Sequence, residues 1–154
     1  MSTTIPKCSV SEMIGFLEIL NDYSGTEDLA RLARDYGMEI DEILPSVEIA
    51  EAMGFVIVEN GNTSLTEIGI KFIKSDIDDR KKILKNSMIK LQLFKLVMQA
   101  LESSPEGRIA SSELSNILQV ITRHPEKHLR RIINWGRYSQ LFNYDSETDE
   151  IFIR

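Results

Sequence analysis

The sequence predicts a mainly α protein (α+β) in which two similar units stand in tandem, joined by a long central helix. Three observations lead to this prediction. Residues 76–103 contain neither Pro nor Gly and place apolar residues at helical spacing. In the first half, helical segments precede a β-branched run and Asn60-Gly61, a strong signal for a two-residue hairpin turn. The second half repeats this order, and Gly25 and Gly107 mark corresponding turns.

The first unit, residues 1–75, is predicted to contain three helices, a two-stranded antiparallel hairpin and a short fourth helix. Residues 1–7, next to Cys8, are expected to form a frayed arm. The hairpin strands are expected at residues 55–59 and 63–65. Each helix is expected to begin at a Ser, Thr or Asp whose side chain accepts a hydrogen bond from a backbone N–H. These N-caps are Thr26, Asp41, Thr66 and Ser9, the last in a capping box with Glu12.

The central helix is predicted at residues 76–103, with Asp76 as its N-cap. From Leu91 to Met98 the apolar residues surround nearly the whole helix, so this part must be covered on more than one side. The sequence leaves open whether the helix is continuous or is broken near residues 86–88, and Asn86-Ser87 is the expected place for a break.

The second unit, residues 104–154, uses the end of the central helix as its first helix. A short strand is expected at Ile109, and Ser111 and Pro125 are expected to begin the next two helices. The strands of its two-stranded hairpin, which enclose an acidic turn, are expected at residues 141–144 and 151–153. The order of three helices and a hairpin in both units is that of a winged helix-turn-helix domain.

An internal duplication is indicated by the spacing of glycines. Gly25 and Gly107 lie 82 residues apart, and so do Gly54 and Gly136. Sequence identity outside these positions is slight, so the repetition is one of pattern.

The composition is that of an ordinary globular protein, with 154 residues, one cysteine and a net charge of −6. A single cysteine excludes an internal disulfide. The sequence has no apolar run long enough to span a bilayer and no signal-peptide core, so we expect a cytoplasmic protein without membrane insertion. The charge is uneven. Residues 1–77 carry five Lys/Arg against 14 acids, a net charge of −9, whereas residues 78–154 carry 13 against 10, a net charge of +3.

Motifs for catalysis are missing from the sequence. There is no glycine-rich phosphate loop, so we expect no nucleotide hydrolysis and no enzymatic activity. Cys8 has no nearby His to activate it. His124 and His128 have the spacing of a zinc pair, but Pro125 lies between them and there is no third ligand. We therefore predict no catalytic, cofactor or metal site, and cap and surface roles for the histidines.

Two groups of motifs occur in a characteristic order along the chain. The C-terminal group is Trp135-Gly-Arg-Tyr138, Leu141-Phe142 and Tyr144-Asp145. The N-terminal group is Leu17-Glu-Ile-Leu20, Pro45, Gly54-Phe55, Leu65-Thr66-x-x-Gly69 and Asp76-Ile77-x-x-Arg80-Lys81. Together these motifs resemble the C-terminal AAA-associated domain family over nearly the whole chain. Relatives have a proline in the middle of the central helix, and its absence here leaves the continuity of that helix open.

This resemblance implies a non-catalytic regulatory module. Members of the family accompany the ATPase domain of nitrate-, sulfonate- or taurine-type ABC importers and also occur as free-standing proteins. The implied partner is therefore an ABC transporter ATPase subunit, and the implied role is protein–protein interaction. The alternative is a winged-helix DNA-binding transcriptional regulator, because the third helix of such a domain enters the major groove.

The third helices of the two units differ in charge on the face that a winged helix presents to DNA. In the first unit this face carries Glu42, Ser46, Glu48 and Glu51, which phosphates would repel. In the second unit the candidate partner- or nucleic-acid-binding residues form a basic stripe. They are Arg123, Lys127, Arg130, Arg131, Asn134 and Arg137. The stripe has three interpretations: a solvated charged face, a protein-docking face or a nucleic-acid face.

Two neighbouring groups of residues make nucleic acid the least favoured of these interpretations. The acidic group would lie close to a DNA backbone and consists of Asp145, Glu147, Asp149 and Glu150. The aromatic group consists of Trp135, Tyr138, Phe142 and Tyr144. We expect these aromatic side chains to pack in the core and against the hairpin and not to stack on bases.

The opposite charges of the two halves can meet within one chain or between two chains in an antiparallel two-fold dimer. We favour the homodimer, because the wide apolar surface of residues 91–98 exceeds what one chain is expected to cover.

Overall fold

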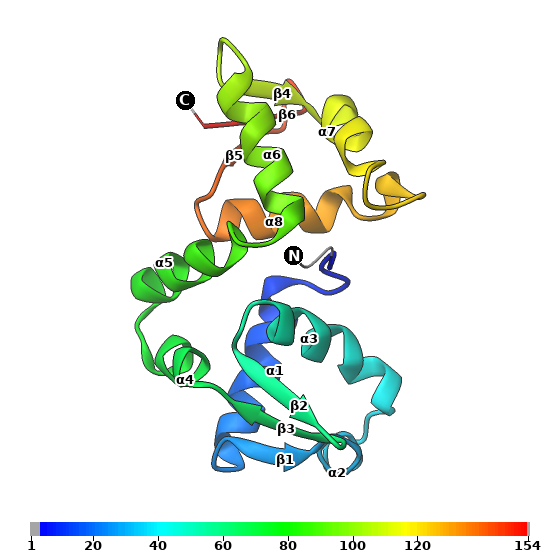
Figure 1. Cartoon of the computed structure of the whole chain (residues 1–154), viewed down its shortest axis with the longest axis vertical. Coiled ribbons are helices and arrows are strands. Elements are labelled where there is room, and N and C mark those ends of the chain that lie inside the picture. The colour runs from blue at the N-terminus through cyan, green and yellow to red at the C-terminus, as the bar shows by residue number, and fades with distance from the viewer. Residues whose placement is uncertain (1–3, 154) are drawn as a thin grey trace.

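The computed structural model describes residues 4–153 and confirms the mainly α class with small antiparallel sheets. The first half contains α1 (Val10–Asp22), β1 (Thr26–Asp28), α2 (Leu29–Asp35), α3 (Ile40–Ala52), β2 (Val56–Glu59), β3 (Asn62–Leu65) and α4 (Glu67–Lys74). It is followed by α5 (Ile77–Met88), α6 (Gln92–Ser103), β4 (Arg108–Ala110), α7 (Ser111–Leu118), α8 (Leu129–Tyr138), β5 (Asn143–Asp145) and β6 (Glu150–Phe152). Figure 1 shows the first half below, the second half above and α5 between them. No helix within residues 4–153 is long and apolar enough to cross a membrane.

Each half contains the predicted antiparallel hairpin, β2–β3 or β5–β6, and a further strand extends each hairpin into a three-stranded sheet. The strand orders are β1-β3-β2 and β4-β6-β5, so the first strand of each half pairs with its last. The predicted strand at Ile109 is confirmed as part of β4. Thr26, predicted as an N-cap, instead begins β1 and pairs with Ser64. The two residues are 38 positions apart, a separation that local sequence patterns do not report.

The two halves share the order of their strands and a backbone hydrogen bond at the start of each sheet. Gly25 and Gly107 precede β1 and β4, with positive φ angles of 86° and 67°. Their carbonyl oxygens accept from the N–H groups of Leu65 and Ile153, at 2.7 and 3.0 Å. The predicted correspondence of these two glycines therefore agrees with their places in the structure.

The second predicted glycine pair, Gly54 and Gly136, is wrong. Gly54 follows α3 with a φ of 83°, whereas Gly136 lies inside α8. Gln140 takes the equivalent position after α8, with a φ of 62°. The sequence comparison failed here because a non-glycine residue occupies the left-handed position in the second half.

The central segment consists of two helices and not one long helix. α5 ends at Met88 and α6 begins at Gln92, and Figure 1 shows that they run in different directions. The break therefore lies just after the predicted residues 86–88. Leu91 and Leu93 are both buried, although a straight helix would place them about 200° apart. The turn allows both side chains to reach the core.

Most of the apolar surface of residues 91–98 is covered within one chain. Leu91 is 2% exposed, and Leu93, Phe94 and Val97 are fully buried. Leu96 and Met98 are half-buried, so less of this surface is left for a second chain than expected, and the homodimer stays a prediction.

Several helix starts are confirmed and others are shifted. The capping box of Ser9 and Glu12 and the caps at Thr66 and Asp76 form as predicted. The corrected N-cap positions are Asp28 for α2, Glu39 for α3 and Ala110 for α7. Pro125 begins a 3-10 turn, Pro125–Lys127, and α8 starts at Leu129. Asp28 caps α2 by accepting a hydrogen bond from the Arg31 N–H, whereas Ala110 makes no side-chain cap bond to α7.

We predict that Gly69→Ala destabilises the protein. Gly69 packs against the backbone of Phe55, just before β2, and a Cβ at this position would overlap the carbonyl oxygen of Phe55. We expect the free energy of unfolding to fall by about 1–3 kcal/mol, the usual cost of overpacking. The control is Gly15→Ala in α1, because no atom lies within 4 Å of the added Cβ. Alanine should there stabilise the helix by about 0.5–1 kcal/mol. Urea denaturation followed by circular dichroism measures both variants, and equal effects would contradict the packing argument.

Candidate functional site

α8 lies at the junction between the two halves, next to the start of the first half (Figure 1). Its apolar side is buried at Ile132 and Trp135. The Trp135 Nε1–H donates a hydrogen bond of 2.9 Å to the carbonyl oxygen of Cys8. The Val10 N–H donates to the Asn134 Oδ1 at 3.4 Å. These contacts hold α8 between the core of the second half and the beginning of α1.

The prediction that the chain before α1 is frayed is wrong for its described part, while residues 1–3 lie outside the described residues. Pro6 and Cys8 are buried. Ser46, predicted to face solvent, is 6% exposed, and its Oγ donates to the Cys8 Sγ at 3.8 Å. Burial raises the pKa of the Cys8 thiol, which makes it a poor nucleophile. The predicted exposure of Glu42, Glu48 and Glu51 is confirmed.

All six residues of the basic stripe are exposed. Four of them lie on α8, Lys127 lies in the preceding 3-10 turn, and Arg123 comes just before that turn. None of its five cations forms an ion pair with a carboxylate of residues 4–153. Asn134, the uncharged residue of the stripe, accepts a hydrogen bond from the Val10 N–H of the first half. The stripe therefore presents unpaired positive charge on a helix whose position is fixed.

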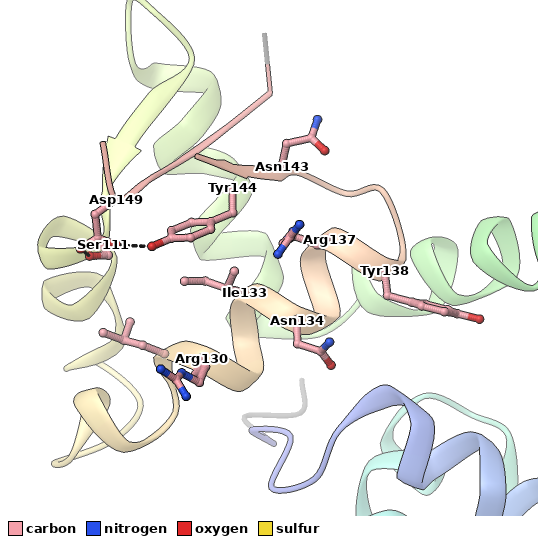
Figure 2. Close-up of a pocket in the computed structure, with 10 residues that line it drawn as sticks. Ser111, Arg130, Ile133, Asn134, Arg137, Tyr138, Asn143, Tyr144 and Asp149 are labelled. Carbon is pink, nitrogen blue, oxygen red and sulfur yellow. Dashed lines mark hydrogen bonds between the residues drawn. The ribbon is translucent and has the colours of Figure 1, made fainter. Parts of the chain in front are cut away.

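A groove of about 830 Å³ lies between α8 and the sheet of the second half. Its α8 wall is formed by Leu129, Arg130, Ile133, Asn134, Arg137 and Tyr138. Its opposite wall is formed by Ser111, Asn143, Tyr144 and Asp149. Figure 2 shows Ile133 and Arg137 between α8 and the strand that carries Tyr144. The sequence predicted the arginines of this groove but not its opposite wall, which comes from three separate elements.

Asp149 organises the opposite wall of the groove. The Ser111 Oγ and the Tyr144 Oη each donate to its carboxylate at 2.6 Å (Figure 2). These bonds, that from Ser111 first, hold the pKa of Asp149 below its usual value. The bond to Asp149 in turn raises the pKa of Tyr144. The Tyr144 side chain is therefore held in place in its neutral form, and the Asp149 carboxylate stays charged.

The acidic turn before β6 is partly neutralised within the second half. Arg108 forms ion pairs with Asp145 at 3.0 Å and with Glu150 at 3.1 Å. Its guanidinium also lies over the Phe152 ring, 4.5 Å from the centroid. Asp145 accepts a hydrogen bond from the Glu147 N–H, which is the main reason for its lowered pKa. The sequence did not reveal these pairs, because Arg108 reaches the turn only through the pairing of β4 with β6.

The predicted packing of the aromatic residues is confirmed for Trp135 and Phe142, both of which are buried. Tyr138 and Tyr144 are half-buried. Within residues 4–153 no three His, Cys, Asp or Glu side chains are grouped to hold a metal ion. His124 is exposed, with its Nδ1 3.8 Å from the Glu126 Oε1.

His128 lies at the junction of the two halves. It lines a cavity of about 400 Å³ together with Lys7 and Glu48, and its buried Nδ1 has no hydrogen-bond partner within residues 4–153. Burial lowers the pKa of His128 first of all. The positive charges of Arg131, Lys7 and Lys127 lower it further.

We therefore predict that His128 makes stability depend on pH. Its pKa is lower in the folded state, so the unfolded state takes up the proton first as the pH falls below about 6.5. The free energy of unfolding should fall more between pH 7 and pH 5.5 in the wild type than in His128→Gln. Urea denaturation at several pH values measures the difference. Parallel pH profiles of the two proteins would exclude this role for His128.

Residues that carry the family resemblance attach α5 to both halves. The Arg80 guanidinium donates to the carbonyl oxygens of Phe72 and Ile73 at 3.1 and 2.7 Å. The Lys81 Nζ lies 5.5 Å from the centroid of the Tyr138 ring. These motif residues therefore stabilise the arrangement of α5 relative to both halves.

Comparison with known families agrees with this resemblance. A family model, the C-terminal AAA-associated domain, matches residues 30–145. The matched region includes α8 and β5 and ends before Asp149. Comparisons with the curated proteins and with the solved structures give no match. Because the family model covers most of the sequence, the chain belongs to the C-terminal AAA-associated domain family.

Proposed function

We propose that this chain is a non-catalytic regulatory module that binds the ATPase subunit of an ABC importer of the nitrate, sulfonate or taurine type. Membership of the C-terminal AAA-associated domain family supports the association with an ATPase. The observation that carries the proposal is the basic stripe, whose cations form no ion pair within residues 4–153 and most of which lies on α8, the helix that Trp135 anchors to Cys8. A fixed array of exposed cations suits docking onto an acidic protein surface, because complementary charge speeds encounter and fixes orientation.

The scaffold in this proposal is a pair of tandem winged-helix units. In the first unit, α1, α2 and α3 pack with the sheet of β1, β2 and β3. In the second, α6, α7 and α8 pack with the sheet of β4, β5 and β6. The shared strand order and the matching bonds at Gly25 and Gly107 support this arrangement. In such a unit α8 would be the helix that recognises a partner.

The second candidate function is DNA binding by a transcriptional regulator. The basic stripe on α8 favours it, since Lys and Arg are the residues that contact phosphates. Two observations weigh against it. Trp135 and Asn134 tie α8 to the first half, and the net charge of −9 over residues 1–77 would repel a phosphate backbone. The exposed Glu48 and Glu51 of α3 would repel a phosphate backbone.

The first prediction of this proposal concerns binding to the ATPase. Candidate ATPase subunits from the same cell should be captured by the wild-type chain, with and without nucleotide. We expect the double variant Arg130→Glu/Arg137→Glu to lose at least about tenfold in affinity, because it reverses the charge of the docking face. The matched control is Lys82→Glu/Lys85→Glu, which makes the same change of net charge at exposed positions of α5. Failure to capture any such ATPase, or equal loss in both variants, would contradict the proposal.

The second prediction concerns DNA. We expect binding weaker than about 1 µM and without sequence selectivity at physiological salt. Residual binding through the stripe should involve about four phosphate contacts, so log K should fall with log salt at a slope of about −0.9 for each contact. Arg130→Ala should then reduce the slope by about one contact. Fluorescence anisotropy with random and promoter-derived duplexes tests this, and nanomolar sequence-selective binding would favour the regulator instead.

A further inference from the structure

We propose that the groove between α8 and β5 binds an acidic helix of the partner protein. Two carboxylates of that helix, seven residues apart, would pair with Arg130 and Arg137, and an apolar side chain between them would pack on Ile133. This inference rests on the proposed function and specifies the chemistry of the docking segment. The groove would then bind an amphipathic helix laid along α8, a common form of peptide recognition.

The charges of the groove select a ligand with carboxylates. Arg130 and Arg137 line the same wall and form no ion pair with a carboxylate of residues 4–153. Arginine binds carboxylates through two parallel hydrogen bonds, which gives the contact direction as well as strength. Asp149 stands on the opposite wall and stays charged. It would repel a carboxylate there and so confine the acidic side of the ligand to α8.

The spacing of the arginines selects a helical ligand. Seven residues along α8 correspond to a rise of about 10.5 Å. On one face of an extended strand, side chains two residues apart are separated by ~6.7 Å and side chains four residues apart by ~13 Å. Neither separation equals the rise of about 10.5 Å between Arg130 and Arg137. In a helix, residues seven apart lie on one face at the same rise of about 10.5 Å.

The apolar part of the groove accepts the residue between the two carboxylates. Leu129 and Ile133 lie on the α8 wall and the Tyr144 ring on the opposite wall. The Tyr144 hydroxyl is already bonded to Asp149, so this wall offers its ring and not a free donor. A leucine three or four residues after the first carboxylate would face this surface.

The test uses the full chain and fluorescein-labelled helical peptides. The first peptide carries two Glu seven residues apart with Leu between them, the second has the same composition with the Glu five residues apart, and the third replaces both Glu by Lys. We expect the first peptide to bind the wild type at least about tenfold more tightly than the other two. Arg130→Glu/Arg137→Glu should lose the first peptide and gain the third. Lys82→Glu/Lys85→Glu should behave as the wild type, and the emission of Trp135 together with circular dichroism checks that each variant is folded.

Several outcomes would overturn the inference. Equal binding of the first two peptides would show that charge alone acts, and displacement of the first peptide by an equal concentration of duplex DNA would point to a nucleic-acid site. A salt-sensitive dimer, detected by sedimentation and lost in Arg130→Glu/Arg137→Glu, would assign the groove to a second copy of this chain.

ATPase capture without peptide binding would contradict only the groove inference. Selective peptide binding without ATPase capture would contradict only the proposed partner.

Discussion

The position of α8 against the first half depends above all on the buried hydrogen bond from the Trp135 indole to the carbonyl oxygen of Cys8. The bond is 2.9 Å long and joins residues 127 positions apart. A buried donor or acceptor that loses its partner costs about 1–3 kcal/mol, and an aromatic ring of this kind buries about 150–250 Å². Because Cys8 precedes α1 and Trp135 lies on α8, this one contact joins the start of the first half to the helix that carries the candidate site.

One side of α8 is buried and anchors the helix, and the other side is exposed and carries the candidate binding residues. Ile132 and Trp135 form the buried side and hold the helix in place, while Arg130 and Arg137 stand on the exposed side. The distance between the two cations along the helix is therefore set before any partner arrives. A ligand that matches this spacing loses less conformational freedom on binding than one that must order a flexible surface.

Within the second half, several acidic side chains are bonded to neighbouring residues, whereas the basic side chains of the stripe form no ion pair within residues 4–153. Arg108 pairs with Asp145 and Glu150 on the sheet, and Asp149 is bonded to Ser111 and Tyr144. These acids are thus engaged in local structure, whereas the cations of the stripe form no ion pair in the described part of the chain. The unpaired positive charge of residues 104–153 lies on α8 and just before it, and that is the physical basis for assigning the candidate site there.

The sequence alone determined features that depend on neighbouring residues. Ser9 with Glu12, and Asp76 with Asp79, cap their helices through bonds three positions long, and the spacing of the basic stripe follows from the helical repeat. Tertiary structure alone decided the pairing of β1 with β3, the burial of Cys8 and the opposite wall of the groove. Each of these needs residues far apart in the chain to meet, and no local propensity or periodicity encodes which of them will do so.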